Sequence, residues 1–95
     1  MSTNIQDLII AIKLKDYNLS LQIANNIKSA IEQNDPVAIN NIVDPKNITE
    51  IHSSLIEYME VPQRLLIMKR RSMTKTTKAY IFTTIIINAI TRVSK

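Results

Sequence analysis

The fold of this chain is decided by residues 75–93, KTTKAYIFTTIIINAITRV. Threonine and isoleucine are β-branched and favour strands, so composition alone would indicate extended structure. The large apolar residues instead recur as adjacent pairs four positions apart, as in Ile81-Phe82 followed by Ile85-Ile86. A half-buried strand alternates every second residue, whereas this spacing is typical of one face of a helix. The pattern therefore predicts an amphipathic helix over about residues 75–93.

Apolar stripes with helical spacing also run through the first half of the chain. They predict a helix over about residues 4–14, with Thr3 and Gln6 at the spacing of a capping box. A second helix is expected over about residues 19–33. It should end before Pro36, because the residue preceding a proline is pushed out of the helical conformation.

Two Asp-Pro steps bracket a short third helix, since Asp35-Pro36 is repeated as Asp44-Pro45 nine residues later. Aspartate is a favoured helix cap, and proline is favoured at the first helical position. A fourth helix is expected from a capping-box pair, Asn47 with Glu50, to the region of Val61-Pro62.

Short connections join all these segments, which favours antiparallel neighbours in a compact bundle. A chain of 95 residues has the length of about one domain. We therefore predict an all-α fold, a compact bundle of four to five short helices forming a single domain over residues 1–95.

The composition excludes several classes of functional site. The chain has no cysteine, which rules out disulfides and thiolate metal sites. It has no glycine, which phosphate-binding loops and dinucleotide motifs require. The single histidine, His52, lacks the second ligand of a metal site, and Glu57 with Glu60 is typical of a solvated face. We expect no enzymatic activity, no catalytic residue, no metal, no cofactor and no small-molecule substrate.

The chain shows no feature of an exported or membrane-spanning protein. Its start lacks a basic-then-apolar signal sequence, because five large apolar residues precede the first base, Lys13. The longest apolar-leaning run, residues 79–90, is shorter than the roughly 18 residues of a spanning helix. We predict a soluble protein, cytoplasmic or otherwise intracellular, for which membrane binding is not expected.

The charges divide the chain in two. Residues 1–60 hold all eight acids against four lysines, a net charge of −4. Residues 61–95 hold eight bases and no acid, a net charge of +8, which together give the +4 of the whole chain. The candidate binding residues among these bases are Arg64, Lys69, Arg70, Arg71, Lys75 and Lys78.

Such a cluster attracts any anion, so several partners stay open. The bases can pack beside the acidic part of the same chain or of a second copy, meet an acidic protein, or neutralise nucleic-acid phosphates. A nucleic acid is less favoured, because no base-stacking aromatic residues are interleaved with the basic run. An anionic membrane is less favoured still, because the bases precede the apolar stretch and do not form its opposite face.

A helix-turn-helix unit would use residues 63–71 as its first helix, residues 72–74 as the turn and the last segment as the recognition helix. A recognition helix presents polar side chains to base edges. The last segment is dominated by isoleucine, so it fits this role poorly.

The function expected from these features is that of a small, non-enzymatic regulatory or adaptor protein that docks a helical face on another protein or on a second copy of itself. The apolar arc of the last helix is wider than one packing neighbour would cover, and Tyr80 and Ile87 extend it. These two residues are the predicted interaction face. The alternative is nucleic-acid binding through the basic cluster from Lys69 to Lys78.

Overall fold

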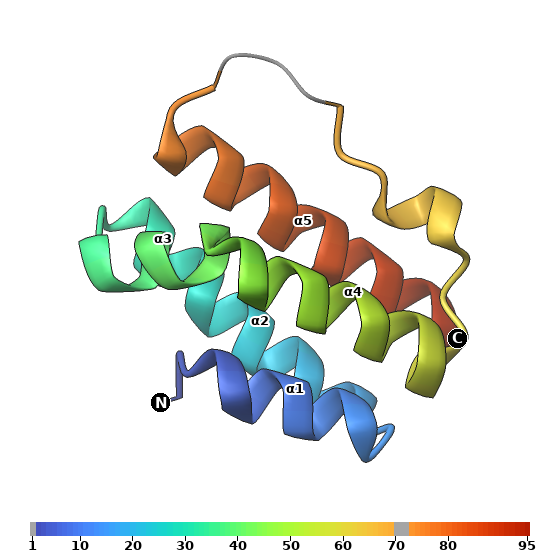
Figure 1. Ribbon diagram of the computed structural model, residues 1–95. Coiled ribbons are helices and arrows are strands. Elements are labelled where there is room, and N and C mark those ends of the chain that lie inside the picture. The colour runs from blue at the N-terminus through green and yellow to red at the C-terminus, as the bar shows by residue number, and fades with distance from the viewer. Residues whose placement is uncertain (1, 70–72) are drawn as a thin grey trace.

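Each predicted stripe forms a helix in the computed structural model, which describes residues 2–69 and 73–95. The helices and one 3-10 turn (η1) are shown in Figure 1 and have these bounds: α1 (Ile5–Lys13), α2 (Tyr17–Glu32), α3 (Pro36–Val43), α4 (Pro45–Met59), η1 (Gln63–Leu66) and α5 (Lys75–Val93). No strand occurs in the described ranges, so the predicted all-α class is confirmed. The β-branched segment is a helix over the predicted range.

Threonine is tolerated in α5 because its hydroxyl groups bond back to the helix. Thr83 is buried, and its hydroxyl donates to the carbonyl oxygen of Ala79 at 2.7 Å. Thr84 and Thr91 donate in the same way, four residues back. Each hydroxyl is thereby satisfied without a partner from another helix.

Polar side chains fix the start of each helix. Asp16 accepts from the backbone N–H of Leu19 at 3.0 Å, and α2 therefore begins at Tyr17, two residues before the predicted start. Asp35 caps α3 with Pro36 at the first position, as predicted. The predicted Thr3 cap is wrong, because Asn4 accepts from the N–H of Gln6 at 2.8 Å.

The predicted start of α4 at Asn47 is also wrong. Asp44 accepts from the N–H of Lys46 at 3.0 Å, and Pro45 opens the helix. The Asp-Pro step supplies both a cap and a preset backbone angle, so it starts the helix before the capping-box pair can. Asn47 instead donates its side-chain N–H to the carbonyl oxygen of Asn41 at 2.8 Å.

Helix ends in this glycine-free chain require unusual backbone angles. Lys15, Asn34 and Glu60 adopt left-handed conformations with φ of 56°, 58° and 54° just after α1, α2 and α4. Glycine normally takes this place because other residues pay a steric cost there. The tight turns between helices are therefore built at some expense of stability.

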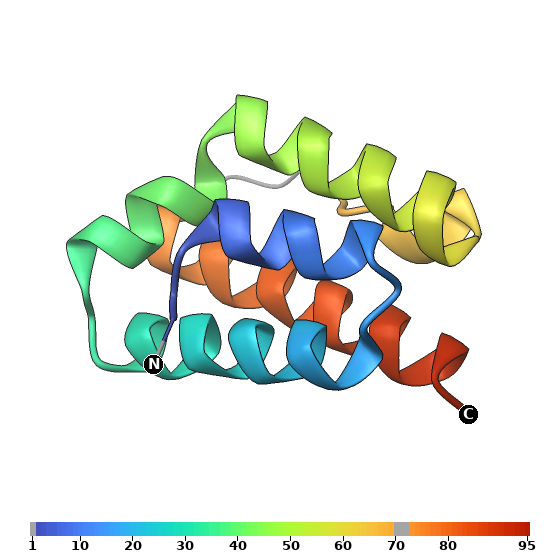
Figure 2. The same cartoon turned by 90° about the horizontal axis from the view of Figure 1, so that it is seen from below.

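The helices surround one core. Their backbones approach most closely between α2 and α5, then between α1 and α4, α3 and α5, and α1 and α2. α4 and α5 approach each other less closely than these pairs. Figures 1 and 2 show α4 and α5 running in the same direction, so that both begin at the end of the bundle where α3 lies.

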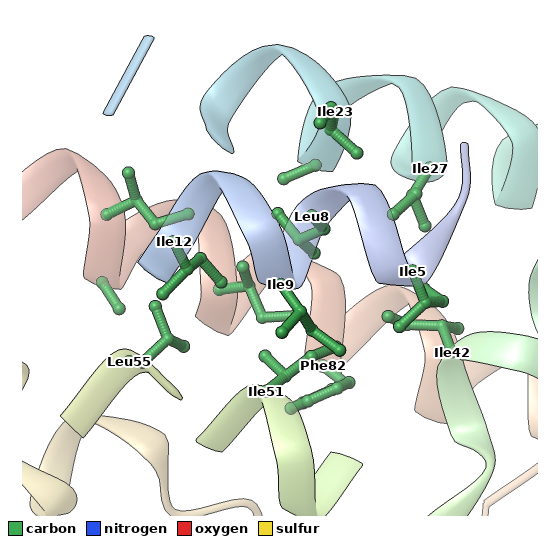
Figure 3. Packing of buried hydrophobic residues seen from close by; sticks show 14 of the residues in the cluster. Ile5, Leu8, Ile9, Ile12, Ile23, Ile27, Ile42, Ile51, Leu55 and Phe82 are labelled. Atoms are coloured by element: carbon green, nitrogen blue, oxygen red, sulfur yellow. The ribbon is translucent and has the colours of Figure 1, made fainter. Parts of the chain in front are cut away.

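Isoleucine dominates this core. Figure 3 shows Ile9 of α1 and Ile51 of α4 packed beside Phe82 of α5. Ile86 and Ile90 continue the buried face of α5. Within the described parts of the chain, no helix has the length and apolar character needed to cross a membrane.

Candidate functional site

Helix α4 carries two rows of apolar side chains. The inner row, Ile51, Leu55 and Met59, is buried against the bundle. The outer row consists of Ile48, His52 and Ile56, four residues apart and rotated by about 100° around the helix. Ile48 and His52 are half-buried, and Ile56 is 41% exposed. The outer row therefore lies at the border of the core, with Ile48 and His52 touching it and Ile56 facing outward.

A groove of about 1050 Å³ runs along this outer row, between α4 and a second wall formed by residues 63–69, Met73 and Lys78. The part of α4 that lines it extends from Pro45 to Ile56, which corresponds to about 16 Å along the helix axis. Its lining comprises Pro45, Ile48, Thr49, His52, Ser53, Ile56, Gln63, Leu66, Ile67, Met68, Lys69, Met73 and Lys78.

The segment after α4 that lines the groove is packed onto the core at several points. Val61 is buried, and its N–H donates to the carbonyl oxygen of Leu55 at 3.1 Å. Leu66 in η1 is also buried. The next residue, Ile67, is 67% exposed, whereas Met68 after it is half-buried and packs against the core.

Two of the predicted basic residues, Lys69 and Lys78, line this groove. Lys75 is exposed one helical turn before Lys78, and its Nζ lies 3.4 Å from the side-chain oxygen of Asn40 in α3. Arg64 is exposed on η1. Arg64, Lys69 and Lys75 are therefore exposed, whereas Lys78 is half-buried. Arg70 and Arg71 lie outside the described residues.

The end of the groove near α3 is electropositive for two reasons. Lys75 and Lys78 occupy the beginning of α5, which has no acidic residue in its first turn. The N-terminus of a helix already carries a partial positive charge, so lysine is disfavoured there and an anion is favoured. α4 begins at the same end, with exposed Lys46 in its first turn.

Tyr80 and Ile87, the predicted interaction face, lie elsewhere. Tyr80 is exposed, but Lys28 of α2 places its Nζ 5.3 Å from the centre of the tyrosine ring. Ile87 is half-buried and packs against the core. Since Tyr80 follows Lys78 by about 200° around the helix, these residues and the groove occupy different sides of α5.

His52 forms part of the groove wall. Its ring stands edge-on to Phe82, with ring centres 5.3 Å apart and an interplanar angle of 69°. Nε2 is buried and has no hydrogen-bond partner among the described residues. Burial lowers the pKa of His52 below 6.5, because the charged imidazolium is desolvated. At neutral pH this side chain is therefore an uncharged wall and not a cation.

The described ranges contain no group of three histidine or acidic residues placed to hold a metal ion. The titratable side chains lining the groove are His52, Lys69 and Lys78.

Sequence reasoning missed the outer row of α4. It placed all the large apolar residues of this helix in one stripe, although positions 48, 52 and 56 form their own row. That stripe consisted of Ile48, Ile51, Leu55, Ile56 and Met59. The sequence did contain a sign of this second row, because the apolar residues of the helix cover a wider arc of its circumference than a single row would. The groove itself was not predictable, because it depends on how residues 63–69 pack beside α4 in three dimensions.

Comparisons with models of protein families, with curated proteins and with solved structures gave no match for this chain.

Proposed function

We propose that this chain is a small, non-enzymatic regulatory or adaptor protein that binds another protein through the groove beside α4. The observation that supports this most strongly is the outer row of α4, an apolar surface that the fold leaves open. Single exposed apolar residues are ordinary, but apolar residues gathered in one hollow are typical of binding surfaces. Here Ile48, Ile56 and Ile67 share one groove.

The shape of the groove supports a macromolecular partner. Sites for small molecules usually enclose about 300–1000 Å³ and surround most of the ligand. This hollow lies at or above the upper end of that range and is an open trough along the side of a helix. Such troughs are the usual seat of a peptide segment of another protein.

The test compares substitutions at two apolar residues that are equally exposed in the wild-type structure. Ile67 and Val37 are each 67% exposed, but Val37 lies on α3 and does not line the groove. We expect tagged wild type and Val37→Asp to capture the same protein from cells of the source, and Ile67→Asp to lose it. Capture that is equal in all three, or no captured protein, would contradict the proposal.

Self-association is a special case of this function. Sedimentation of the wild type over a range of concentrations tests it, with Tyr80→Asp as the variant on the other predicted face. Weaker association in Tyr80→Asp but not in Ile67→Asp would assign the contact to Tyr80 and Ile87 and remove the groove from it.

Nucleic-acid binding is the second candidate, favoured by the exposure of Lys69 and Lys75 at the start of the basic cluster. Duplex binding would weaken with salt, with a log–log slope of about −0.9 per phosphate neutralised. Replacing both lysines by glutamine should reduce that slope. A duplex bound with this slope by wild type and Ile67→Asp alike would favour this candidate over the protein-binding one.

A further inference from the structure

We infer that the occupant of the groove is an acidic amphipathic α-helix, about three turns long, presented by another protein. The inference rests on the proposed function and names the partner's chemistry. It is argued from the backbone available in the groove, from its apolar lining and from the charges at its edge.

The groove suits a helix better than an extended strand. A strand added to a protein needs a free sheet edge to satisfy its backbone N–H and C=O groups, and the described ranges hold no strand. A helix satisfies these groups internally and can lay an apolar face against side chains alone. The 16 Å of α4 estimated above matches about three turns of such a helix.

The apolar lining sets the pattern that the ligand must carry. Ile48, His52 and Ile56 form one wall at intervals of one helical turn, and Ile67 faces them from the chain after η1. A ligand helix meets such a row with apolar residues three or four positions apart. Uncharged His52 can lie against this apolar face without a desolvated charge.

Charge complementarity selects acidic residues for the rest of the ligand. Lys69 and Lys78 line the groove, and no acidic residue follows Glu60 in the sequence. The beginning of α5 adds Lys75 to a helix end that is already positive. At the opposite end of α4 stand Glu57 and Glu60. The acidic turn of the ligand therefore belongs over Lys78.

A nucleic acid fits the groove less well. Its phosphates would satisfy the lysines but leave Ile56 and Ile67 against polar groups. Single-strand binders stack bases on aromatic side chains, and among the described lining residues the only aromatic ring is that of His52. An acidic helix matches the apolar wall and the lysines together.

The experiment uses the full chain and synthetic peptides of about 12 residues, a length of just over three turns. One peptide carries an apolar row and glutamates, the second has the same residues in scrambled order, and the third has lysine in place of glutamate. Affinity is measured by fluorescence anisotropy and location by amide chemical shifts. We expect the acidic amphipathic peptide to bind at least about tenfold more tightly than the other two, with shifts at Ile48, Ile56 and Ile67.

Charge exchange sharpens the test. Lys69→Glu combined with Lys78→Glu should weaken the acidic peptide about tenfold and strengthen the lysine peptide. Ile67→Asp should weaken the acidic peptide, and Val37→Asp should leave its affinity unchanged. Equal affinity for acidic and lysine peptides, shifts outside the groove, or groove shifts with a short DNA duplex would each overturn the inference.

The two proposals can fail separately. If the acidic peptide does not bind but a cellular protein is captured in a groove-dependent way, only the acidic-helix inference is overturned. If the acidic peptide does not bind and no cellular protein is captured, both the acidic-helix inference and the proposed function are overturned.

Discussion

The two apolar rows of α4 are one residue apart in sequence and differ in their physical situation. Leu55 of the inner row is buried on all sides, whereas its neighbour Ile56 of the outer row faces an open groove. Both are large aliphatic residues on the same helix, with the same backbone geometry. The difference between them is one of neighbours. α1 packs along α4, and Phe82 of α5 lies beside Ile51 of the inner row, whereas nothing described covers Ile56 to the same extent.

This contrast separates stability from recognition. Burial of a large aliphatic side chain contributes about 1.5–3 kcal/mol to folding, and most of that gain is available only to the inner row. An outer residue keeps part of its apolar surface in water and can gain by burying it against a partner. We therefore expect substitutions in the inner row to change the free energy of unfolding and those in the outer row to change binding.

The largest effect is expected from a charge in the inner row. Leu55→Asp places an unpaired carboxylate in the core, and a small domain with about 5–15 kcal/mol of stability cannot easily accommodate it. Circular dichroism should show loss of cooperative unfolding. Ile56→Asp, one residue away, should retain helicity and a cooperative transition. A folded Leu55→Asp protein would contradict the assignment of the inner row.

Truncation in the two rows should give a graded result. Ile51→Ala removes fully buried methyl groups and should cost about 2–5 kcal/mol, because a cavity remains. Ile48→Ala removes half-buried groups at the groove and should cost about 1 kcal/mol or less. Urea unfolding measures both values. Equal losses would show that the outer row belongs to the core.

Removing the cap of α4 should act on both rows together. Asp44→Ala leaves the N–H of Lys46 without its acceptor and should lower the unfolding free energy by about 1 kcal/mol. Affinity for the acidic peptide should be unchanged once the folded fraction is taken into account. A large loss of affinity would mean that the helix start, and not the outer row, forms the binding surface.

The left-handed end of α4 offers a stabilising change. Glu60→Gly relieves a steric cost at φ of 54°, and the gain should exceed the entropy that glycine adds to the unfolded chain, leaving about 0.5 kcal/mol. Thermal unfolding measures it. A decrease in stability would show that the Glu60 side chain contributes more than its backbone strain costs.

The smallest expected effect is a pH dependence from His52. Burial lowers its pKa in the folded protein below the ordinary 6.5, so the unfolded chain binds the proton more readily. Its contribution is fully present above pH 6.5 and is lost as pH falls through the folded pKa. Between about pH 7 and pH 5 the urea midpoint should decline less in His52→Gln than in the wild type. Identical declines would contradict the burial of this imidazole.

Periodicity predicted the helices and their order, because apolar rows at helical spacing determine which faces can be buried. The Asp35-Pro36 start and the whole of α5 were predicted correctly. The start at Asp16 was missed, and for α4 the capping pair at Asn47 was preferred to the Asp44-Pro45 step, because several capping residues compete locally. The groove follows from distances between α4, α5 and the chain after Leu66, which are set by tertiary packing and leave no local pattern.

The acidic amphipathic peptide titrated into the wild-type protein, with amide shifts recorded for each residue, tests the central claim most directly. The outer row of α4 as a binding surface predicts that the largest shifts occur at Ile48, Ile56 and Ile67. Largest shifts at Tyr80 and Ile87, or no shift at saturating peptide, would contradict it.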